Sequence, residues 1–322
     1  MKRRISARSL SDARVLITGA TGFIGRHLCK ALVNAGAIVY ALRRPDSFSS
    51  SAEWATHLNI EWLEADLCDS DRLKSVIKDA AASHIFHLAA ATAVDRGFET
   101  AQTMIANNLQ GTINLLHTLE ATSYTCFIHT GSAEEYGMAT GPFQETTFPQ
   151  PVSAYSASKA SAALFCDMYH RTLGCPIIIL RPFLVYGPGQ PANKLIPQAI
   201  QAALKDQPFP MSSGRQTREF TYIDDLIAGY LKAAVTPEAI GHTINLGTGK
   251  TYTILEVVEQ IRQLTGSHMR LQVGALPDRA GEIMLYQCDN TKARHLLAWT
   301  PETSLIQGLQ KTIDWYKMVL TR

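Results

Sequence analysis

The chain has 322 residues, of which 46% are hydrophobic and 18% are charged, and its formal net charge is +2. This composition is typical of a globular protein and excludes a disordered or collagen-like chain. The near-neutral charge gives no reason to expect DNA or RNA as a partner.

Neither the cysteines nor the apolar segments point to a metal site or a membrane. The six cysteines are scattered singly, without the paired spacing of a zinc site, and we expect them to be reduced. No apolar run approaches the roughly 20 residues of a membrane span. The basic segment 1–10 leads into the polar Ser11 and Asp12 instead of the apolar region of a secretory signal. We therefore expect a cytoplasmic protein without a metal ion and without membrane contact.

Short β-branched segments alternate with longer amphipathic segments from residue 14 to residue 181. This alternation is typical of parallel strands joined by crossover helices. We expect strands at residues 15–18, 38–42, 60–63, 85–88, 126–130 and 177–180. Residues 1–186 are therefore predicted to form mainly a Rossmann-type α/β domain with a doubly wound parallel sheet.

Glycines and prolines at residues 187–191 break the chain after this sheet. Shorter elements follow, with helices near residues 194–205, 254–265 and 304–320 and a strand that enters Asn245. They predict a smaller C-terminal α/β lobe, which binds the substrate, mainly over residues 187–322 with some chain crossing back.

The first predicted strand leads directly into a glycine-rich turn at residues 19–25, and residues 26–34 then favour a helix. Glycines are needed where a turn is tight and a pyrophosphate approaches the backbone, and a helix N-terminus offers N–H groups and partial positive charge. The turn therefore predicts a nicotinamide dinucleotide site. The expected contacts come from Gly19, Thr21, Gly22, Phe23, Ile24 and Gly25.

Arg43 and Arg44 end the second predicted strand, where an acid favours NAD and an arginine accommodates the phosphate of NADP. No carboxylate stands at this position of the sequence, and a guanidinium can hold a phosphate through two hydrogen bonds. We therefore expect NADP(H) to be favoured. The alternative is that both arginines are solvated and that the cofactor is NAD(H).

Two further segments follow neighbouring strands of the predicted sheet. Asp66, beside Leu67, follows the third strand, where its carboxylate would accept from the adenine amino group; a helix N-cap is the alternative role. The small residues after the fourth strand are expected to let the backbone pass close to the cofactor. They belong to the segment Leu88, Ala89 and Ala90.

Three polar residues form the predicted catalytic group. Ser132 follows the fifth strand, and the spacing of four places Tyr155 and Lys159 on one helical face. The ammonium of Lys159 is expected to favour the phenolate and lower the pKa of Tyr155, which then exchanges a proton with a substrate hydroxyl or carbonyl. Ser132 is expected to hydrogen-bond the same substrate oxygen.

These motifs together resemble the extended short-chain dehydrogenase/reductase family, in its nucleotide-sugar epimerase, dehydratase and reductase branch. The resemblance covers nearly the whole chain. It rests on the glycine turn, the catalytic group and the following further segments: Asp66, 87–90, 108–112, 136–137, 181–182, 186–188, 218–220, 224–225 and 279–282.

The resemblance implies roles for residues that the spacing alone does not explain. Arg218 and Arg279 match positions that hold the diphosphate of a sugar nucleotide, although surface salt bridges are the alternative. Asn108 matches a residue that supports the catalytic helix, and it is expected near the cofactor together with Pro182. Leu184 stands where many relatives carry a substrate-contacting asparagine, which makes the identity of the sugar unsafe to transfer.

The choice among reactions depends on the residues after Ser132 and on the cofactor. Glu134 matches the glutamate of a dehydratase acid pair, whereas Ala133 stands where some dehydratases place an aspartate. Glu135 is expected to be a solvated loop charge. Because Arg43 favours NADPH, our leading hypothesis is the NADPH-dependent reduction of a nucleotide-linked 4-keto-6-deoxy sugar. The alternatives are a nucleotide-sugar 4-epimerase or 4,6-dehydratase with a recycled cofactor, and a non-catalytic NADP-binding sensor or subunit.

Family members commonly pair through two long helices. The apolar faces of residues 104–119 and 154–169 match this pattern and predict a homodimer, while packing within the chain is the alternative.

Overall fold

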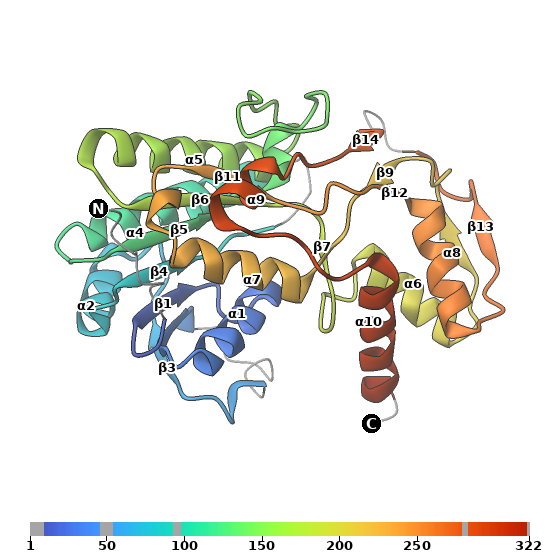
Figure 1. Cartoon of the computed structure of the whole chain (residues 1–322), viewed down its shortest axis with the longest axis horizontal. Helices are drawn as coiled ribbons and strands as arrows, with labels where there is room; N and C mark the ends of the chain where they lie inside the picture. Colours follow the sequence, from blue (N-terminus) through green and yellow to red (C-terminus); the bar gives the residue numbers. More distant parts are fainter. Residues whose placement is uncertain (1–9, 46–53, 93–97, 279–282, 321–322) are drawn as a thin grey trace, which may run out of the picture.

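The computed structural model describes residues 10–45, 54–92, 98–278 and 283–320 (Figure 1). Its centre is a seven-stranded sheet in the order β11-β6-β5-β4-β1-β2-β3. Every neighbouring pair in this sheet is parallel. The strands are β1 (Arg14–Thr18), β2 (Ile38–Arg43), β3 (Ile60–Glu64), β4 (His84–His87), β5 (Cys126–Thr130), β6 (Ile177–Pro182) and β11 (Thr243–Leu246). The predicted doubly wound sheet is confirmed, with Leu88 just beyond β4 instead of inside it.

Helices cover both faces of the sheet because its strands are apolar on both sides. On one face, α1 (Phe23–Asn34) and α7 (Ile223–Ala234) bury Leu28 and Ile227 in the same core cluster as Ile17 of β1. On the other face, α2 (Ser70–Ala80), α4 (Gly111–Leu119) and α5 (Ala154–Leu173) pack onto a second cluster that includes Leu16 and Phe127. The alternation of side chains along each strand thus divides the core into two layers.

The strand that enters Asn245 was expected in the smaller lobe, but it joins the main sheet. β11 pairs with β6 in the register Thr243↔Ile179, and it forms the edge of the seven-stranded sheet. The same return of the chain brings α7 against α1. The segments after residue 186 therefore complete the large sheet as well as building a separate part.

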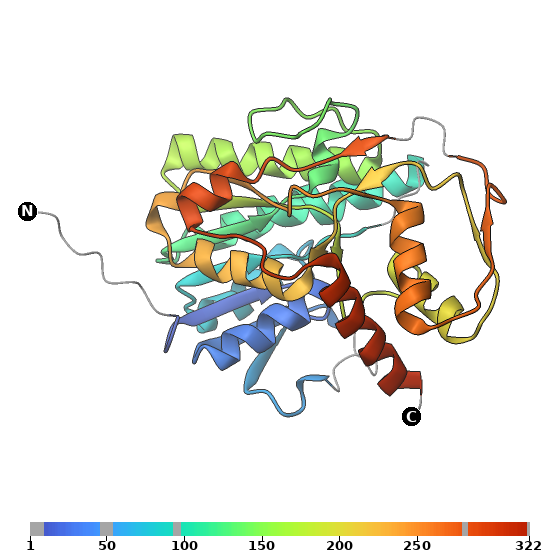
Figure 2. The same ribbon diagram turned by 45° about the vertical axis from the view of Figure 1, so that its right-hand side comes forward.

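The remaining elements lie beyond the carboxyl ends of the strands (Figures 1 and 2). They comprise α6 (Leu195–Leu204), α8 (Ile254–Thr265), α10 (Leu305–Leu320) and short sheets, whereas α9 (Thr291–Leu297) packs against β11 and α7 of the larger part. These sheets are β7 (Val185–Tyr186) with β10 (Thr221–Tyr222), β8 (Phe209–Met211) with β13 (Leu271–Val273), and β9 (Thr217–Arg218) between β12 (Tyr252–Thr253) and β14 (Leu285–Tyr286).

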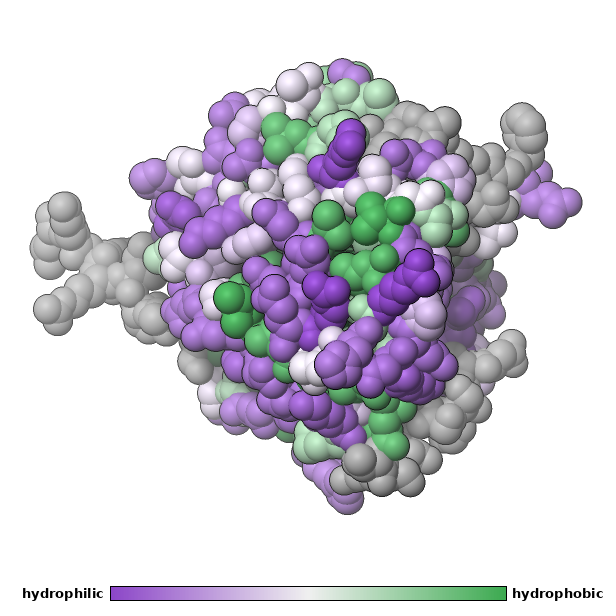
Figure 3. Space-filling view, turned by 90° about the vertical axis from the view of Figure 1, so that its right-hand side faces the viewer, coloured by the Kyte–Doolittle hydropathy of each residue, from purple (hydrophilic) through white to green (hydrophobic). Residues whose placement is uncertain are grey.

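The smaller part shares a core with the sheet. Ile196 of α6, Val257 of α8 and Ile313 of α10 belong to the cluster that contains Ile17. The outer face of this part is mostly hydrophilic, with hydrophobic side chains in separated patches (Figure 3). The continuous core holds the two parts together around the carboxyl edge of the sheet.

Candidate active site

The glycine turn between β1 and α1 has no room for side chains at two positions. Gly19 has φ +70, and a Cβ there would lie 2.6 Å from the backbone N of Ala89. A Cβ on Gly25 would lie 2.1 Å from the carbonyl oxygen of Gly19. In this described segment, α1 begins after Gly22 without a side-chain cap and without an acidic residue in its first turn. The N-terminus of α1 therefore offers backbone N–H groups and positive potential to a phosphate.

A buried histidine fixes the loop after β4 next to this turn. The Nδ1 of His87 forms a hydrogen bond with the hydroxyl of Thr18 at 2.7 Å, and its Nε2 forms one with the hydroxyl of Thr112 at 2.8 Å. The Thr18 hydroxyl also accepts from the backbone N of Ala89 at 3.1 Å. Burial and the charge of Lys159 lower the pKa of His87 to about 3, so the ring is neutral. The sequence analysis used this segment for its small residues and for the family resemblance, but it gave the histidine no role of its own.

Asn108 ties the same loop to the catalytic helix. It lies in a π-helical segment, η3 (Ile105–Gln110), between α3 (Phe98–Met104) and α4. Its Oδ1 accepts from the backbone N of Ala91 at 2.7 Å, and its Nδ2 donates to the Ala91 carbonyl at 3.0 Å and to the Ser158 hydroxyl at 2.9 Å. The side chain is buried, so one amide joins η3, the loop after β4 and α5.

Arg43 pairs with a carboxylate and is therefore not a solvated charge. β2 and β3 pair in the register Arg43↔Glu64, and Arg43 donates from Nε and Nη2 to Glu64 Oε1 at 3.0 and 2.6 Å. Its guanidinium also lies 5.3 Å from the ring centroid of Trp62. The sequence shows no carboxylate beside Arg43, and the expectation built on this was wrong, because Glu64 on the neighbouring strand β3 pairs with it. Arg44 is exposed.

Asp66 forms a turn and does not cap α2. Its Oδ1 accepts from the backbone N of Cys68 at 2.8 Å, while Asp69 is the N-cap of α2 and accepts from Arg72 N at 3.0 Å. The following Leu67 is buried, and its carbonyl accepts from the side chain of Asn114 at 2.8 Å. The turn after β3 is therefore fixed by local and tertiary hydrogen bonds.

The structure brings Ser132 and Tyr155 together from two elements. Ser132 is the N-cap of η4 (Ala133–Tyr136), where its Oγ accepts from Glu134 N at 3.1 Å. Ser153 caps α5 by accepting from Ser156 N at 3.1 Å, which places Tyr155 in the first turn of that helix. A hydrogen bond links the side chains of Ser132 and Tyr155.

The pKa shifts of the catalytic pair differ from the sequence-based expectation. Burial raises the pKa of Tyr155 and the charge of Glu134 adds to the rise, while the hydrogen bond from Ser132 opposes it. Lys159 lies one turn later on α5, and burial lowers the pKa of its ammonium to about 8. The protein side chains alone therefore do not lower the pKa of the phenol, because desolvation disfavours its anion.

Glu134 and Glu135 differ sharply in environment although they are adjacent. Glu134 is half-buried, and its charge acts on Tyr155. Glu135 has 0% exposure, accepts from Ser132 N at 2.7 Å, and pairs with Arg181 Nε at 2.8 Å. The expectation that Glu135 is a solvated loop charge was wrong, because its partner comes from β6.

Arg218 of β9 is held by two backbone carbonyls and an aromatic ring. Its Nη1 donates to the carbonyls of Thr217 at 2.8 Å and Ile283 at 2.7 Å, and its guanidinium lies 5.6 Å from the ring centroid of Tyr286. Burial raises the pKa of Tyr286, and the charge of Glu134 acts in the same direction. The sequence analysis gave Tyr286 no role, although its ring lies beside Arg218. The second predicted arginine, Arg279, lies outside the described residues.

Two other residues near β6 have clear positions. Pro182 is the last residue of β6, is buried, and stands opposite Leu246 of β11. Leu184 is 37% exposed, while its neighbour Phe183 packs with Phe143 and Tyr286 in a separate aromatic cluster. The apolar Leu184 thus remains accessible at the carboxyl end of β6.

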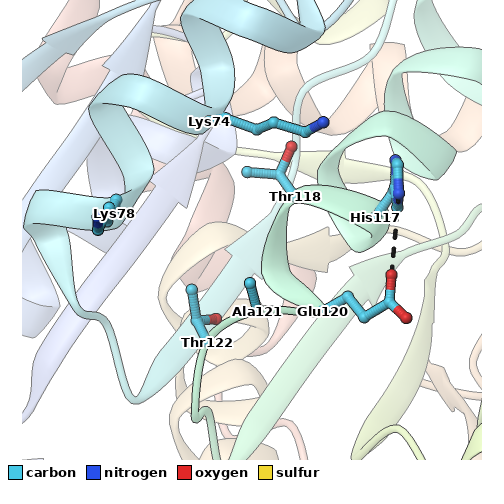
Figure 4. A pocket seen from close by; sticks show the side chains of 7 residues that line it. All are labelled: Lys74, Lys78, His117, Thr118, Glu120, Ala121 and Thr122. Carbon is cyan, nitrogen blue, oxygen red and sulfur yellow. Dashed lines mark ion pairs between the residues drawn. The ribbon is translucent and has the colours of Figure 1, made fainter.

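A separate surface hollow of about 500 Å³ lies between α2 and α4 (Figure 4). It is lined by Lys74, Lys78 and the pair His117–Glu120, whose Nε2 and Oε2 are 3.8 Å apart. These segments precede the amino ends of β4 and β5, so the hollow lies at the opposite edge of the sheet from the glycine turn.

Within the described ranges, no group of three or more His, Cys, Asp or Glu side chains is arranged to hold a metal ion. None of the helices in those ranges is both long and apolar enough to cross a membrane.

Comparisons with known proteins agree with this geometry. The model of the NAD dependent epimerase/dehydratase family matches residues 15–247. The dTDP-glucose 4,6-dehydratase of Haemophilus influenzae is 30% identical over 94% of this chain and 97% of its own length. The structure of UDP-glucuronic acid 4-epimerase from Bacillus cereus, with UDP-glucuronic acid and NAD, has a TM-score of 0.86 and 32% identity over 95% of this chain and 99% of that chain. That of dTDP-glucose 4,6-dehydratase from Bacillus anthracis, with NAD, has a TM-score of 0.83 and 26% identity over 94% and 96% of the two chains.

The family match spans more than half of the chain and includes β1 through β11, the glycine turn and the Ser132, Tyr155 and Lys159 group. The expected resemblance is confirmed, and the protein is an enzyme of the extended short-chain dehydrogenase/reductase type. The chain belongs to the NAD-dependent epimerase/dehydratase family.

Proposed function

We propose that the protein is a nucleotide-sugar 4-epimerase that retains NAD as its cofactor. The observation that carries this proposal is the environment of Ser132, Tyr155 and Lys159, which provides for proton transfer at one sugar carbon, while the adjacent Ala133 is buried and carries no acid. The relatives solved with NAD, a UDP-glucuronic acid 4-epimerase and a dTDP-glucose 4,6-dehydratase, support NAD as the cofactor.

The pairing of Arg43 with Glu64 favours NAD over NADP. The Glu64 carboxylate neutralises the guanidinium that a ribose phosphate would need, and it would repel that phosphate. This removes the reason for favouring a reductase, since the hypothesis of net reduction depended on an exchangeable NADPH. The alternative of a recycled cofactor fits the site better.

Each side chain of the site has a chemical role in this proposal. A bound nicotinamide dinucleotide supplies the hydride acceptor and donor at the sugar C4. Tyr155 accepts the proton of the C4 hydroxyl when the ketone forms, and returns it when the alcohol re-forms with inverted configuration. Ser132 would hydrogen-bond the same oxygen, and the ammonium of Lys159, one helical turn later, would offset part of the desolvation that disfavours the phenolate of Tyr155.

Residues on both sides of this group would hold the ligands. The N-terminus of α1 and the glycine turn before it would hold the cofactor pyrophosphate, because this helix start offers backbone N–H groups without a side-chain cap and without an acidic residue. Arg218 would hold the substrate diphosphate, and Arg279 is proposed for the same role from the family resemblance. Asp66 would contact the adenosine part of the cofactor.

A 4,6-dehydratase is the second candidate, because the half-buried Glu134 acts on Tyr155 and matches the dehydratase glutamate. Such a reaction also removes the C5 proton and protonates the departing 6-hydroxyl. Glu134 would serve one of these steps, but Ala133 has no group for the other. This difference places the dehydratase behind the epimerase.

The experiment that tests the proposal has two steps. Mass spectrometry of the cofactor released from denatured, freshly purified protein should find NAD in near-stoichiometric amount. The intact protein is then incubated with UDP-glucose, UDP-glucuronic acid and dTDP-glucose, and the products are identified by NMR. A 4-epimer supports the proposal, a 4-keto-6-deoxy sugar shows the dehydratase, and an empty site that prefers NADPH restores the reductase hypothesis.

We also propose that the protein is a homodimer. α5 exposes Leu164, Phe165 and Leu173, and the adjacent η3 exposes Ile105. Such large apolar side chains on two neighbouring helices are typical of a surface covered by another chain. A second copy would form a four-helix contact with the same faces.

A further inference from the structure

Arg218 ends the middle strand of a three-stranded sheet, and Glu219 directly follows it. Arg218 pairs with Tyr252 of β12 on one side and with Tyr286 of β14 on the other. Its guanidinium lies 5.6 Å from the ring centroid of Tyr286 and donates to the carbonyl of Ile283 at 2.7 Å. The direction of the guanidinium therefore depends on where β14 lies against β9.

Glu219 holds both neighbours of β9 at the end of this strand. Its Oε1 accepts from the backbone N of Thr248 at 3.0 Å, and its Oε2 accepts from that of Gly249 at 3.2 Å and that of Cys288 at 2.8 Å. Thr248 and Gly249 lie in the loop that leads into β12, and Cys288 lies in the segment that leaves β14. One carboxylate thus fixes the two outer strands beside Arg218.

The surrounding backbone is packed closely on this carboxylate. Glu219 has 0% exposure. A Cβ on Gly247 would lie 1.9 Å from Glu219 Oε1 and 2.8 Å from Cys288 Cβ, so the glycine makes room for the carboxylate and for the segment after β14. The side chain of Asn290 donates to the carbonyl of the same glycine at 2.8 Å. A displaced carboxylate would therefore displace both segments.

The charge of Glu219 lowers the stability of the folded state above neutral pH. Burial raises the pKa of this carboxyl from 4.5 to about 7, and the described part of the chain gives it no salt bridge. Because the charge adds no stability there, the contribution of the carboxylate lies in what its two oxygens hold. They accept from segments next to two different strands at once.

We propose that Glu219 is a positioning residue that, through β12 and β14, orients the guanidinium of Arg218 toward the diphosphate of the nucleotide sugar. The proposal rests on the function proposed above, because that function assigns the substrate diphosphate to Arg218. Glu219 itself is fully buried and acts only through these strands. Its loss should therefore weaken substrate binding and leave the proton transfer at Tyr155 nearly unchanged.

The test measures the affinity of the full chain, with its co-purified cofactor, for UDP and for dTDP by isothermal titration calorimetry. The measurement is made at about pH 8, where Glu219 is largely ionised. Glu219→Met keeps the length of the side chain and removes both acceptor oxygens. We expect it to lower the affinity for the nucleotide that binds the wild type about tenfold.

Asp225→Asn is the matched control. Asp225 is another buried carboxylate that accepts from a backbone N, that of Thr303 at 2.9 Å, but it lies on α7 and holds no segment next to β9. The control should leave the affinity for the nucleotide unchanged. An equal loss in Asp225→Asn and Glu219→Met would show a general effect of destabilisation and would contradict the proposal.

A double-mutant cycle shows whether Glu219 acts through Arg218. Arg218→Gln should lower the affinity about tenfold or more, since it removes the charge that holds the diphosphate. Glu219→Met should then have little further effect in the Arg218→Gln background, because the guanidinium that it orients is absent. A full tenfold loss in both backgrounds would overturn the proposal, since Glu219 would then act on the site without Arg218.

Glu219→Gln keeps the test valid if Glu219→Met does not fold, because the amide retains one acceptor oxygen. The loss of affinity should then be smaller, about threefold, and again absent in the Arg218→Gln background. Wild-type affinity in whichever of the two variants folds would refute the inference.

The same measurements separate this inference from the proposed function. A loss in Arg218→Gln together with wild-type affinity in the Glu219 variants would refute the inference alone and leave the epimerase intact. Wild-type affinity in Arg218→Gln, or a wild type that binds neither nucleotide, would remove the diphosphate role of Arg218 and the inference with it. The expected cycle in a protein that turns over no nucleotide sugar would support the role of Glu219 and refute the epimerase.

Kinetics give a second readout with a sugar that is turned over. Glu219→Met should raise KM about tenfold and change kcat less than about twofold, because it alters binding and not the reacting groups. A loss confined to kcat would contradict the orientation of Arg218 as the role of Glu219.

Discussion

Glu64 lies opposite Arg43 across two neighbouring parallel strands, and its Oε1 accepts two hydrogen bonds from the guanidinium. The two residues are 21 positions apart in the chain. Their pairing places a carboxylate where the strand end itself has only arginines. The cofactor preference that we propose therefore depends on a contact between strands.

Glu64→Ala should shift this preference toward NADP. The change removes the carboxylate that neutralises Arg43 and leaves the guanidinium available to a ribose phosphate. We expect the ratio of NADP affinity to NAD affinity to rise at least about tenfold, measured by competition for the cofactor-free protein. Glu61→Ala, on an exposed position of the same strand, is the control and should not change the ratio. An equal shift in both variants would contradict the assignment.

Tyr155→Phe should abolish turnover and leave the cofactor bound. The change removes only the hydroxyl that exchanges the proton and that Ser132 hydrogen-bonds. A loss of about 10²–10⁴-fold in kcat is expected for a missing acid/base group. Turnover and the amount of co-purified cofactor are measured on the same preparations. Turnover equal to that of the wild type would refute the catalytic assignment of Tyr155.

Asn108→Ala should destabilise the fold far more than the same change at the preceding residue. Asn108 is buried and bonds both backbone groups of Ala91 as well as Ser158, so its loss leaves several buried groups without partners. We expect the free energy of unfolding to fall by about 2–4 kcal/mol. Asn107→Ala removes one hydrogen bond, to the Thr103 carbonyl at 2.9 Å, and should cost under about 1 kcal/mol. Urea denaturation compares the two; similar losses would refute the special role of Asn108.

Glu219 should make stability depend on pH. This fully buried carboxyl accepts from the backbone N of Thr248, Gly249 and Cys288 at 3.0, 3.2 and 2.8 Å. Burial nevertheless raises its pKa from 4.5 to about 7. Between these two values the folded state binds more protons at this site than the unfolded state, so its contribution to the free energy of unfolding falls as pH rises from about 4.5 to about 7.

Glu219→Gln removes this proton uptake and should flatten the profile. The difference in unfolding free energy between variant and wild type should move in favour of the variant by up to about 3 kcal/mol between about pH 4.5 and pH 8. Urea denaturation at both pH values measures it. A difference that stays constant with pH would show that Glu219 titrates in the folded protein as it does in the unfolded chain.

Leu164→Glu should dissociate the proposed dimer. Leu164 is 61% exposed on α5, in the centre of the apolar face that we assign to the contact between copies. A charge there would have to be buried without a partner. Light scattering after gel filtration should show a monomer. Ile306→Glu, at a residue 54% exposed on α10, is the control and should remain dimeric. A wild-type monomer would contradict the assignment at once.

Features encoded by residues close in the chain were predictable. The glycine turn directly follows its strand, and Tyr155 and Lys159 are one helical turn apart. The six predicted strands were found because β-branched segments are distinct from the amphipathic helices between them. The membership of β11 in the main sheet was not predictable in this way. The sequence of a short apolar strand does not indicate which other strand it will pair with.

The sequence by itself thus determined the fold class, the family, the glycine turn and the spacing that places Tyr155 and Lys159 one helical turn apart. Only the tertiary structure decided how the neighbouring charges act. It paired Glu135 with Arg181, 46 positions away, and Glu64 with Arg43, because parallel strands bring distant residues to the same edge of the sheet. The charge of a carboxylate is visible in the sequence, but its pKa and its partner depend on burial and on what folds against it.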